Sequence, residues 1–261
     1  MTRFSKLDFD KTVIPIAPTL VEDAWPNLDE NGCLQAGDER FGVGDYEIAL
    51  TCYSRALRFN RDCISGWIGQ ARCLIAMGEY PDAVTWSDRA LERFADTPEL
   101  LACKGLALAH QADWSALEYL DGAVQMKSPP AWVWIARGEG LLLTGQNVEN
   151  AQRCFLKAQE LAPTDPQIEL RIAMAYIRSR QFARARILIT AVMVKLSRNV
   201  LALTQAGITY EGLGEYDAAR GFYERALAIR SDYATAQSGM NRVLGGNPFS
   251  RLFKRMCQRS T

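Results

Sequence analysis

The chain has 261 residues, of which 48% are hydrophobic and 23% are charged, a composition typical of folded globular proteins and not of disordered ones. Thirty basic and thirty acidic residues give no net charge at pH 7, which argues against a general nucleic-acid binder because such proteins carry a basic face. No run of about 18 apolar residues occurs, so we expect no transmembrane helix.

Residues 1–29 differ from the rest of the chain. Residues 13–18, VIPIAP, are apolar but interrupted by proline, which favours an extended backbone. The N-terminus has no apolar core of a secretory signal, so we expect a cytoplasmic protein. Two interpretations stay open: a loosely packed leader, or a tethered segment whose residues 11–20 fold back onto the protein at high effective concentration.

From residue 30 onward a motif recurs at a fixed period. The letters GDYEIA at residues 44–49 return as GEYPDA at residues 78–83 and as GEYDAA at residues 214–219. The first two copies are 34 residues apart, and the third follows after four more periods of 34. A period of this length predicts a solenoid of helix pairs.

Each repeat is predicted to be two antiparallel helices, the second of which carries a small residue, a bulky residue four positions later and a small residue three positions after that. This spacing places the three side chains on one helix face, where small residues let the backbones approach and bulky ones fill the gaps. The six sets are Ala49, Tyr53 and Ala56; Ala83, Ser87 and Ala90; Ala116, Leu120 and Ala123; Ala151, Phe155 and Ala158; Ala185, Ile189 and Val192; and Ala219, Tyr223 and Ala226.

This pattern resembles the tetratricopeptide repeat family, with six repeats over residues 30–232. The departures from it are Ser87 and Arg180, the latter standing where glycine is usual. The resemblance implies an all-α fold, a right-handed superhelical solenoid of antiparallel helix pairs. Residues 233–246 are predicted to form a helix that caps the last pair and ends at the Gly-Gly-Asn-Pro of residues 245–248.

Signals for catalysis are missing from the sequence. The single histidine, His110, has no cysteine or acidic cluster at metal-binding spacing beside it, and we interpret it as a helix-end residue. Phosphate-loop, nucleophile-elbow, zinc-protease and dinucleotide motifs do not occur. We therefore expect no enzyme, no cofactor and no metal. The seven cysteines include no CxxC pair and fall mostly at core positions, so we expect them to be reduced and buried.

In the family that the chain resembles, the first helices of the repeats line a concave groove that binds a partner. The resemblance implies that the groove here is lined by Leu34, Asp38, Phe41, Ile68, Arg72, Ile75, Glu99, Leu106, Trp132, Ile135, Glu139, Leu142, Leu170, Arg171, Met174, Arg178, Gln205 and Ile208. Apolar pockets with a few charges suit an amphipathic helix or an extended apolar segment. An alternative interpretation is that some of these side chains are core between repeats.

One subclass of the family, the co-chaperones of heat-shock proteins, holds a C-terminal carboxylate with a clamp of lysine, asparagine and arginine. This chain has Leu34 and Asp38 where the clamp would need lysine and asparagine, so we do not expect that mode.

Residues 247–261 form a basic tail. Phe249, Leu252, Phe253 and Met256 share one helical face, and basic residues occupy the rest. Such a helix binds weakly to an anionic membrane or to an acidic partner, or it packs back on the last repeat.

The leading hypothesis is a non-catalytic adaptor or scaffold that binds an apolar segment of another protein in its groove. Two alternatives are a chaperone for a secreted or unstable protein, and the regulatory subunit of an enzyme complex. Proteins of the family that the chain resembles often self-associate through terminal helices, so a homo-oligomer stays open as an alternative to a monomer.

Overall fold

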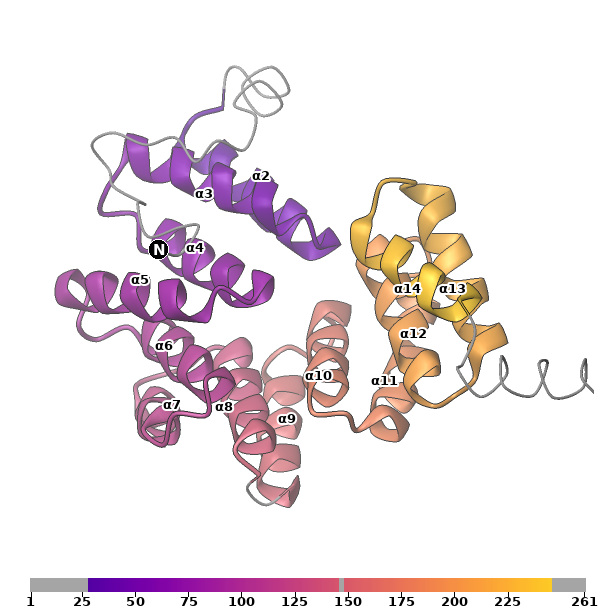
Figure 1. Ribbon diagram of the computed structural model, residues 1–261. Coiled ribbons are helices and arrows are strands. Elements are labelled where there is room, and N and C mark those ends of the chain that lie inside the picture. Colours follow the sequence, from indigo (N-terminus) through magenta and orange to yellow (C-terminus); the bar gives the residue numbers. More distant parts are fainter. Residues whose placement is uncertain (1–27, 146–147, 246–261) are drawn as a thin grey trace, which may run out of the picture. The chain divides into compact units, whose positions relative to one another are not determined.

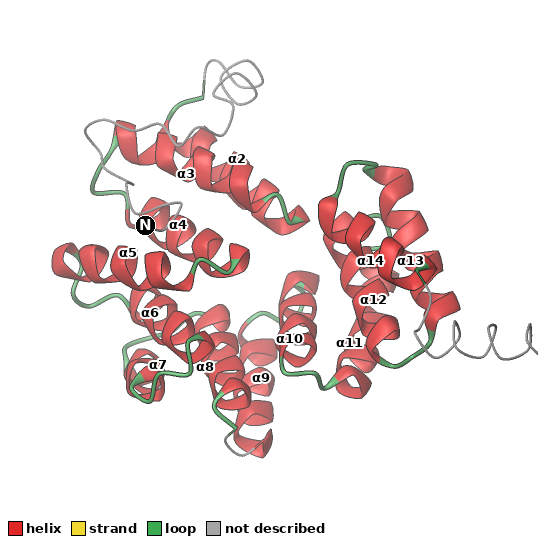
Figure 2. Cartoon of the chain, in the orientation of Figure 1, coloured by secondary structure: helices red, strands yellow, loops and turns green. Residues whose placement is uncertain are grey.

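The computed structural model describes residues 28–145 and 148–245, and every regular element within these ranges is an α-helix (Figure 2). The helices in chain order are α2 (Glu30–Val43), α3 (Tyr46–Phe59), α4 (Ile64–Met77), α5 (Tyr80–Arg93), α6 (Pro98–His110), α7 (Ala116–Gln125), α8 (Ala131–Leu143), α9 (Val148–Leu161), α10 (Pro166–Arg178), α11 (Phe182–Lys195), α12 (Val200–Gly212), α13 (Tyr216–Ile229) and α14 (Ala234–Leu244). The predicted all-α helical-repeat class is confirmed.

The helices divide into two compact units between Ile168 and Glu169, within α10. Unit 1 holds α2 to α9, from indigo to pink in Figure 1, and unit 2 holds α11 to α14, from orange to yellow. In unit 1 each of the four helix pairs packs internally, and the first helices α2, α4, α6 and α8 contact one another in succession. In unit 2, α12 contacts α13 and α14. The first helices of unit 1 therefore form a continuous row.

The predicted register of the second helices is confirmed. Every residue of the six small–bulky–small sets is 3% exposed or less. The polar departure, Ser87, satisfies its hydroxyl by donating a hydrogen bond of 2.8 Å to the carbonyl oxygen of Ala83, one turn earlier in α5. The position therefore stays buried without an unpaired polar group.

The bulky residue of a second helix joins its own pair to the next one. The ring of Tyr53 lies between glycines on α2 and α4, where an added Cβ would come within 2.7 Å of the ring at Gly37 and 2.6 Å at Gly69. In unit 2, the ring of Tyr223 lies in the same way between Gly207 of α12 and Gly239 of α14. No side chain larger than hydrogen fits beside either ring unless the ring moves.

A residue in the left-handed conformation follows the first helix of each pair. Four of these residues are glycines, among them Gly78 with φ 83° and Gly214 with φ 79°. The other two are Ala112 with φ 57° and Arg180 with φ 60°, whose Cβ atoms make this conformation costly. The recurring glycine thus marks the turn between paired helices, and Arg180 adopts the turn without one.

Several predictions concern residues outside the described ranges: the extended leader up to residue 27, its folding back onto the groove, the basic tail of residues 247–261, and Cys257. Asp29, at the end of the predicted leader, caps α2 by accepting a hydrogen bond of 2.8 Å from the backbone N–H of Gly32. The six described cysteines are buried, as predicted. None of the helices described here is long and apolar enough to span a membrane.

Candidate protein-binding site

The residues predicted to line the groove differ in their exposure. Six are buried, namely Phe41, Leu106, Ile135, Glu139, Leu142 and Leu170. Ten are partly buried, namely Leu34, Ile68, Arg72, Ile75, Glu99, Trp132, Arg171, Met174, Gln205 and Ile208. Asp38 and Arg178 are exposed. The buried residues belong to the packing between helices, so the other two classes form the surface that solvent reaches.

Glu139 departs most from the expectation of a groove residue. Its side chain is 2% exposed, and its Oε1 atom lies 3.0 Å from Nε2 of His110. The ring of His110 stacks on that of Tyr80, with centroids 4.3 Å apart. His110 is the last residue of α6, as predicted. The carboxylate of Glu139 is therefore engaged inside unit 1, where it joins α8 to the end of α6.

Partly buried side chains of three first helices form one surface. We define the first-helix face of unit 1 as Leu34 of α2, Ile68, Arg72 and Ile75 of α4, and Trp132 of α8. Its apolar members pack against the core cluster of the first two helix pairs. Ile75 and Trp132 also pack against the cluster built on α6, α7 and α8. The face is therefore a continuous, partly exposed apolar surface with one cation in it.

That cation, Arg72, lies over two aromatic rings. Its guanidinium carbon is 4.7 Å from the ring centroid of Phe41 on α2 and 4.9 Å from that of Trp132 on α8. Each such cation–π contact contributes about 0.5–2 kcal/mol, and more when water is excluded. The two contacts hold Arg72 at a defined place on the face.

No carboxylate of the described residues forms an ion pair with Arg72. The nearby Asp38 instead accepts a hydrogen bond of 2.7 Å from the Tyr53 hydroxyl. Burial and that hydrogen bond raise the pKa of Tyr53, whereas the charge of Arg72 acts to lower it. Burial likewise raises the pKa of Cys103 to about 12, against the opposing effect of Arg72. The charge of Arg72 thus reaches into the interior of unit 1.

The corresponding arginine of unit 2 is paired. Arg242 of α14 donates hydrogen bonds of 2.7 and 2.9 Å to the two carboxylate oxygens of Glu211 on α12. The Tyr223 hydroxyl donates a further hydrogen bond of 2.6 Å to Glu211. Burial acts to raise the pKa of Glu211, but the hydrogen bonds from Arg242 and Tyr223 outweigh it and lower that pKa. This cluster neutralises its own charge.

Repeat position relates the two clusters. Tyr223 and Arg242 follow Tyr53 and Arg72 by 170 residues, which is five periods of 34. At the same interval Glu211 corresponds to Phe41, so unit 1 carries an aromatic ring where unit 2 carries the carboxylate. Arg242 is not among the site residues predicted from the sequence. Alignment of α14 with α4 at this interval would have identified it.

The groove residues predicted in unit 2 include a cationic pair on α10. Arg178 is exposed and Arg171 is partly buried, as are Met174 on the same helix and Gln205 and Ile208 on α12. Ile208 packs against the core cluster around Tyr223.

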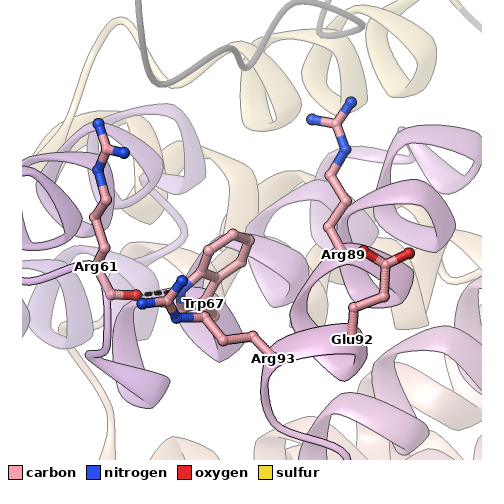
Figure 3. A pocket seen from close by; sticks show the side chains of 5 residues that line it. All are labelled: Arg61, Trp67, Arg89, Glu92 and Arg93. Atoms are coloured by element: carbon pink, nitrogen blue, oxygen red, sulfur yellow. Dashed lines mark hydrogen bonds between the residues drawn. The ribbon is translucent and has the colours of Figure 1, made fainter.

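A pocket of about 370 Å³ lies elsewhere on unit 1, lined by Arg61, Trp67, Arg89, Glu92 and Arg93. Arg61 and Arg89 extend toward the same side from opposite edges of it (Figure 3). Arg93 is paired with Asp62, and Trp67 donates a hydrogen bond of 2.9 Å to the carbonyl oxygen of Arg61. Its charges are thus partly neutralised. Within the described ranges no group of three His, Cys, Asp or Glu side chains is placed to hold a metal ion.

The fold and this face define a helical-repeat protein, and comparison with known proteins names the family. The family model described as tetratricopeptide repeat matches residues 34–98, and a second model of that description matches residues 202–237. The chain belongs to the tetratricopeptide repeat family. Proteins of this family are generally non-catalytic, and their fold serves as a scaffold for protein–protein interaction.

Solved structures are similar to the chain in fold. A tetratricopeptide repeat protein from Parabacteroides merdae is 18% identical with a TM-score of 0.54, and the match covers 85% of this chain and 88% of that one. Cut9, in the Cut9–Hcn1 hetero-tetramer of APC/C, is 17% identical with a TM-score of 0.51, over 87% of this chain and 45% of the other. Human IFIT1, solved as a dimer with m7Gppp-AAAA, is 14% identical with a TM-score of 0.54, over 82% and 55%.

The chain thus spans about half the length of the last two proteins. No curated protein matches its sequence.

Proposed function

We propose that the chain is an adaptor that binds an apolar segment of a partner protein on the first-helix face of unit 1. The observation that carries the proposal is the combination of packing and exposure at Leu34, Ile68, Ile75 and Trp132. These side chains pack on the core, yet each keeps part of its surface open to solvent. A partner that covers them gains hydrophobic burial without having to displace the core.

The rigidity of the face favours binding. Its side chains come from α2, α4 and α8, which belong to the row of first helices that α6 completes, and the Arg72 stack joins these three helices. A surface that is already ordered loses little conformational entropy when a partner binds. An amphipathic helix or an extended strand with regularly spaced apolar residues fits such a surface.

The test compares capture of partners from native lysate by the wild-type chain and by an Ile68→Gln/Ile75→Gln variant. Glutamine is similar in size to isoleucine but polar, so it weakens apolar binding with less damage to packing than a charge would cause. Ile187→Gln is the matched control, because Ile187 is 72% exposed on α11 of unit 2. Ile135 and Leu142, which the sequence predicted for the groove, are unsuitable because they are 5% and 8% exposed.

A protein retained by the wild type and the control but lost by the double variant supports the proposal, provided that circular dichroism shows equal helix content. If the wild type, the control and the double variant all retain the same proteins, the first-helix face of unit 1 is not the binding site. The captured partner then separates the narrower hypotheses. A partner that is soluble only with this chain indicates a chaperone, and a partner enzyme whose turnover changes indicates a regulatory subunit.

A further inference from the structure

We infer that Arg72 recognises an acidic side chain of the partner segment, so that this segment carries an aspartate or glutamate flanked by apolar residues. The inference rests on the proposed function and adds the chemistry of the ligand. It concerns a side-chain carboxylate within the segment and requires no free C-terminus.

Arg72 carries its charge in partly apolar surroundings. Arg72 is a partly buried residue, and its guanidinium lies over the rings of Phe41 and Trp132 and forms no ion pair with a described carboxylate. Arginine carries five N–H donors. An aromatic face attracts the charge of the guanidinium but does not offer an oxygen atom as a hydrogen-bond acceptor. A partly desolvated cation attracts an anion more strongly than a fully hydrated surface arginine does.

Unit 2 shows what an arginine at this repeat position can bind. At the same repeat position Arg242 donates hydrogen bonds to both carboxylate oxygens of Glu211, and Glu211 lies where unit 1 has Phe41. An arginine at this position can therefore bind a carboxylate in bidentate geometry, which is the arrangement guanidinium favours. Unit 1 presents the same arginine without the internal carboxylate, and the partner supplies it.

On α4, Arg72 lies between two isoleucines. Ile68 precedes it by four residues and Ile75 follows it by three, so the three side chains share one helical face. A bound segment that places a carboxylate on Arg72 places its neighbouring side chains on the two isoleucines. The segment should therefore read apolar, acidic, apolar at the spacing of its own secondary structure.

Asp38 sharpens this expectation. Its carboxylate accepts a hydrogen bond of 2.7 Å from the Tyr53 hydroxyl, and the charges of Asp38 and Arg72 both act on the pKa of that tyrosine. A partner carboxylate competes with no salt bridge for Arg72, although the negative charge of Asp38 opposes it. Asp38→Asn should therefore tighten binding of an acidic peptide.

The experiment is selection of a displayed random-peptide library on the full chain, followed by affinity measurement of the enriched peptides. We expect enriched peptides with an aspartate or glutamate at a fixed position between apolar residues. Arg72→Gln should weaken their binding by about 10- to 100-fold, the range for loss of a hydrogen bond to a charged group. Arg72→Glu should select lysine or arginine at the same position.

Two variants serve as controls. Arg89→Glu makes the same change of charge at an exposed position of α5 and should leave the selected sequences unchanged. Phe41→Glu introduces the residue that unit 2 carries at this repeat position, and its carboxylate should pair with Arg72. The preference for peptides with an acidic residue should then disappear although Arg72 is intact. Circular dichroism and thermal unfolding establish which variants are folded. If Arg72→Glu is not folded, Arg72→Gln replaces it, and the preference for an acidic residue should then disappear.

The outcomes separate the two proposals. If no peptide is enriched above a surface without protein, the proposed function fails. If apolar peptides are enriched without a fixed acidic residue, or if Arg72→Glu selects the same peptides as the wild type, the proposed function stands and the role of Arg72 is overturned. Enrichment of sequences that match residues 1–27 of this chain would overturn the assignment to a partner.

Discussion

The clusters around Tyr53 in unit 1 and Tyr223 in unit 2 share their packing and differ in their charges. Each tyrosine lies between two glycines of successive first helices, and each hydroxyl donates to a carboxylate. In unit 2 that carboxylate also neutralises Arg242, whereas in unit 1 Arg72 lies over two rings instead. Packing between repeats therefore constrains the tyrosine and the glycines, but it leaves the neighbouring charges free to differ.

This difference indicates where binding specificity lies in such a chain. A repeat whose charges are paired internally offers a partner little beyond apolar contact, because a partner must break the pair to use either charge. A repeat with an arginine held by rings offers a charge at little reorganisation cost. The four predictions that follow test this comparison.

The largest effect is expected from removing the shared packing. Tyr53→Ala and Tyr223→Ala should each lower the free energy of unfolding by about 3–5 kcal/mol, because each empties a site between two helix pairs. Urea unfolding followed by circular dichroism measures the change. Tyr216→Ala is the control, since Tyr216 is 41% exposed, and should change stability by less than about 1 kcal/mol. Equal losses in the three variants would contradict the assigned role of the buried rings.

Adding a methyl group beside each ring should cost less. Gly69→Ala and Gly239→Ala should destabilise the chain by about 1–3 kcal/mol, because the new Cβ would lie 2.6 Å from the ring of Tyr53 or 2.3 Å from that of Tyr223. Gly221→Ala on α13 has nothing within 4 Å and should instead stabilise by about 0.5–1 kcal/mol. Thermal unfolding should show shifts of opposite sign. Stabilisation by all three changes would mean that the rings move freely.

The two turns without glycine supply a smaller effect, one in each unit. Ala112→Gly and Arg180→Gly should each stabilise by about 1 kcal/mol, because glycine tolerates the left-handed conformation that costs other residues about 1–2 kcal/mol. Gly78→Ala, the reverse change at φ 83°, should destabilise by a similar amount. Unfolding midpoints measure all three. A loss of stability on placing glycine at residue 112 or 180 would refute the strain argument.

The smallest effect is a dependence of stability on pH, which we expect from the Glu211–Arg242 pair of unit 2. The pKa of Glu211 is lowered in the folded state, so its contribution to stability is present above the unfolded pKa of about 4.3 and is lost as the pH falls through the folded pKa. The Arg242 side chain is 53% exposed, so water screens the pair and the contribution should be below about 1 kcal/mol. Glu211→Gln should flatten the loss of stability between pH 5 and the folded pKa, and Arg242→Gln should do the same. Unfolding curves with the same pH dependence as the wild type in both variants would contradict the pairing.

The sequence predicted the fold well because the repeat signal depends on local spacing. The small–bulky–small sets, the helix-ending glycines and the last single helix can all be located by counting in steps of 34. The candidate site was predicted less well. Ile135 and Glu139 were assigned to a groove, yet they are 5% and 1% exposed. Whether a residue on a first helix faces solvent or the core depends on the sizes of side chains on the neighbouring helix pairs. The sequence of its own helix does not contain this information.

The amino-acid sequence alone determined the helix pairs, their register and the buried tyrosines, because each depends on residue type at helical spacing. Tertiary structure alone decided what surrounds each charge. Arg72 and Arg242 occupy the same repeat position, but one lies over Phe41 and Trp132 and the other pairs with Glu211. The reason is physical: a charge interacts over a few ångströms with groups from several helices, and only folding brings those groups together.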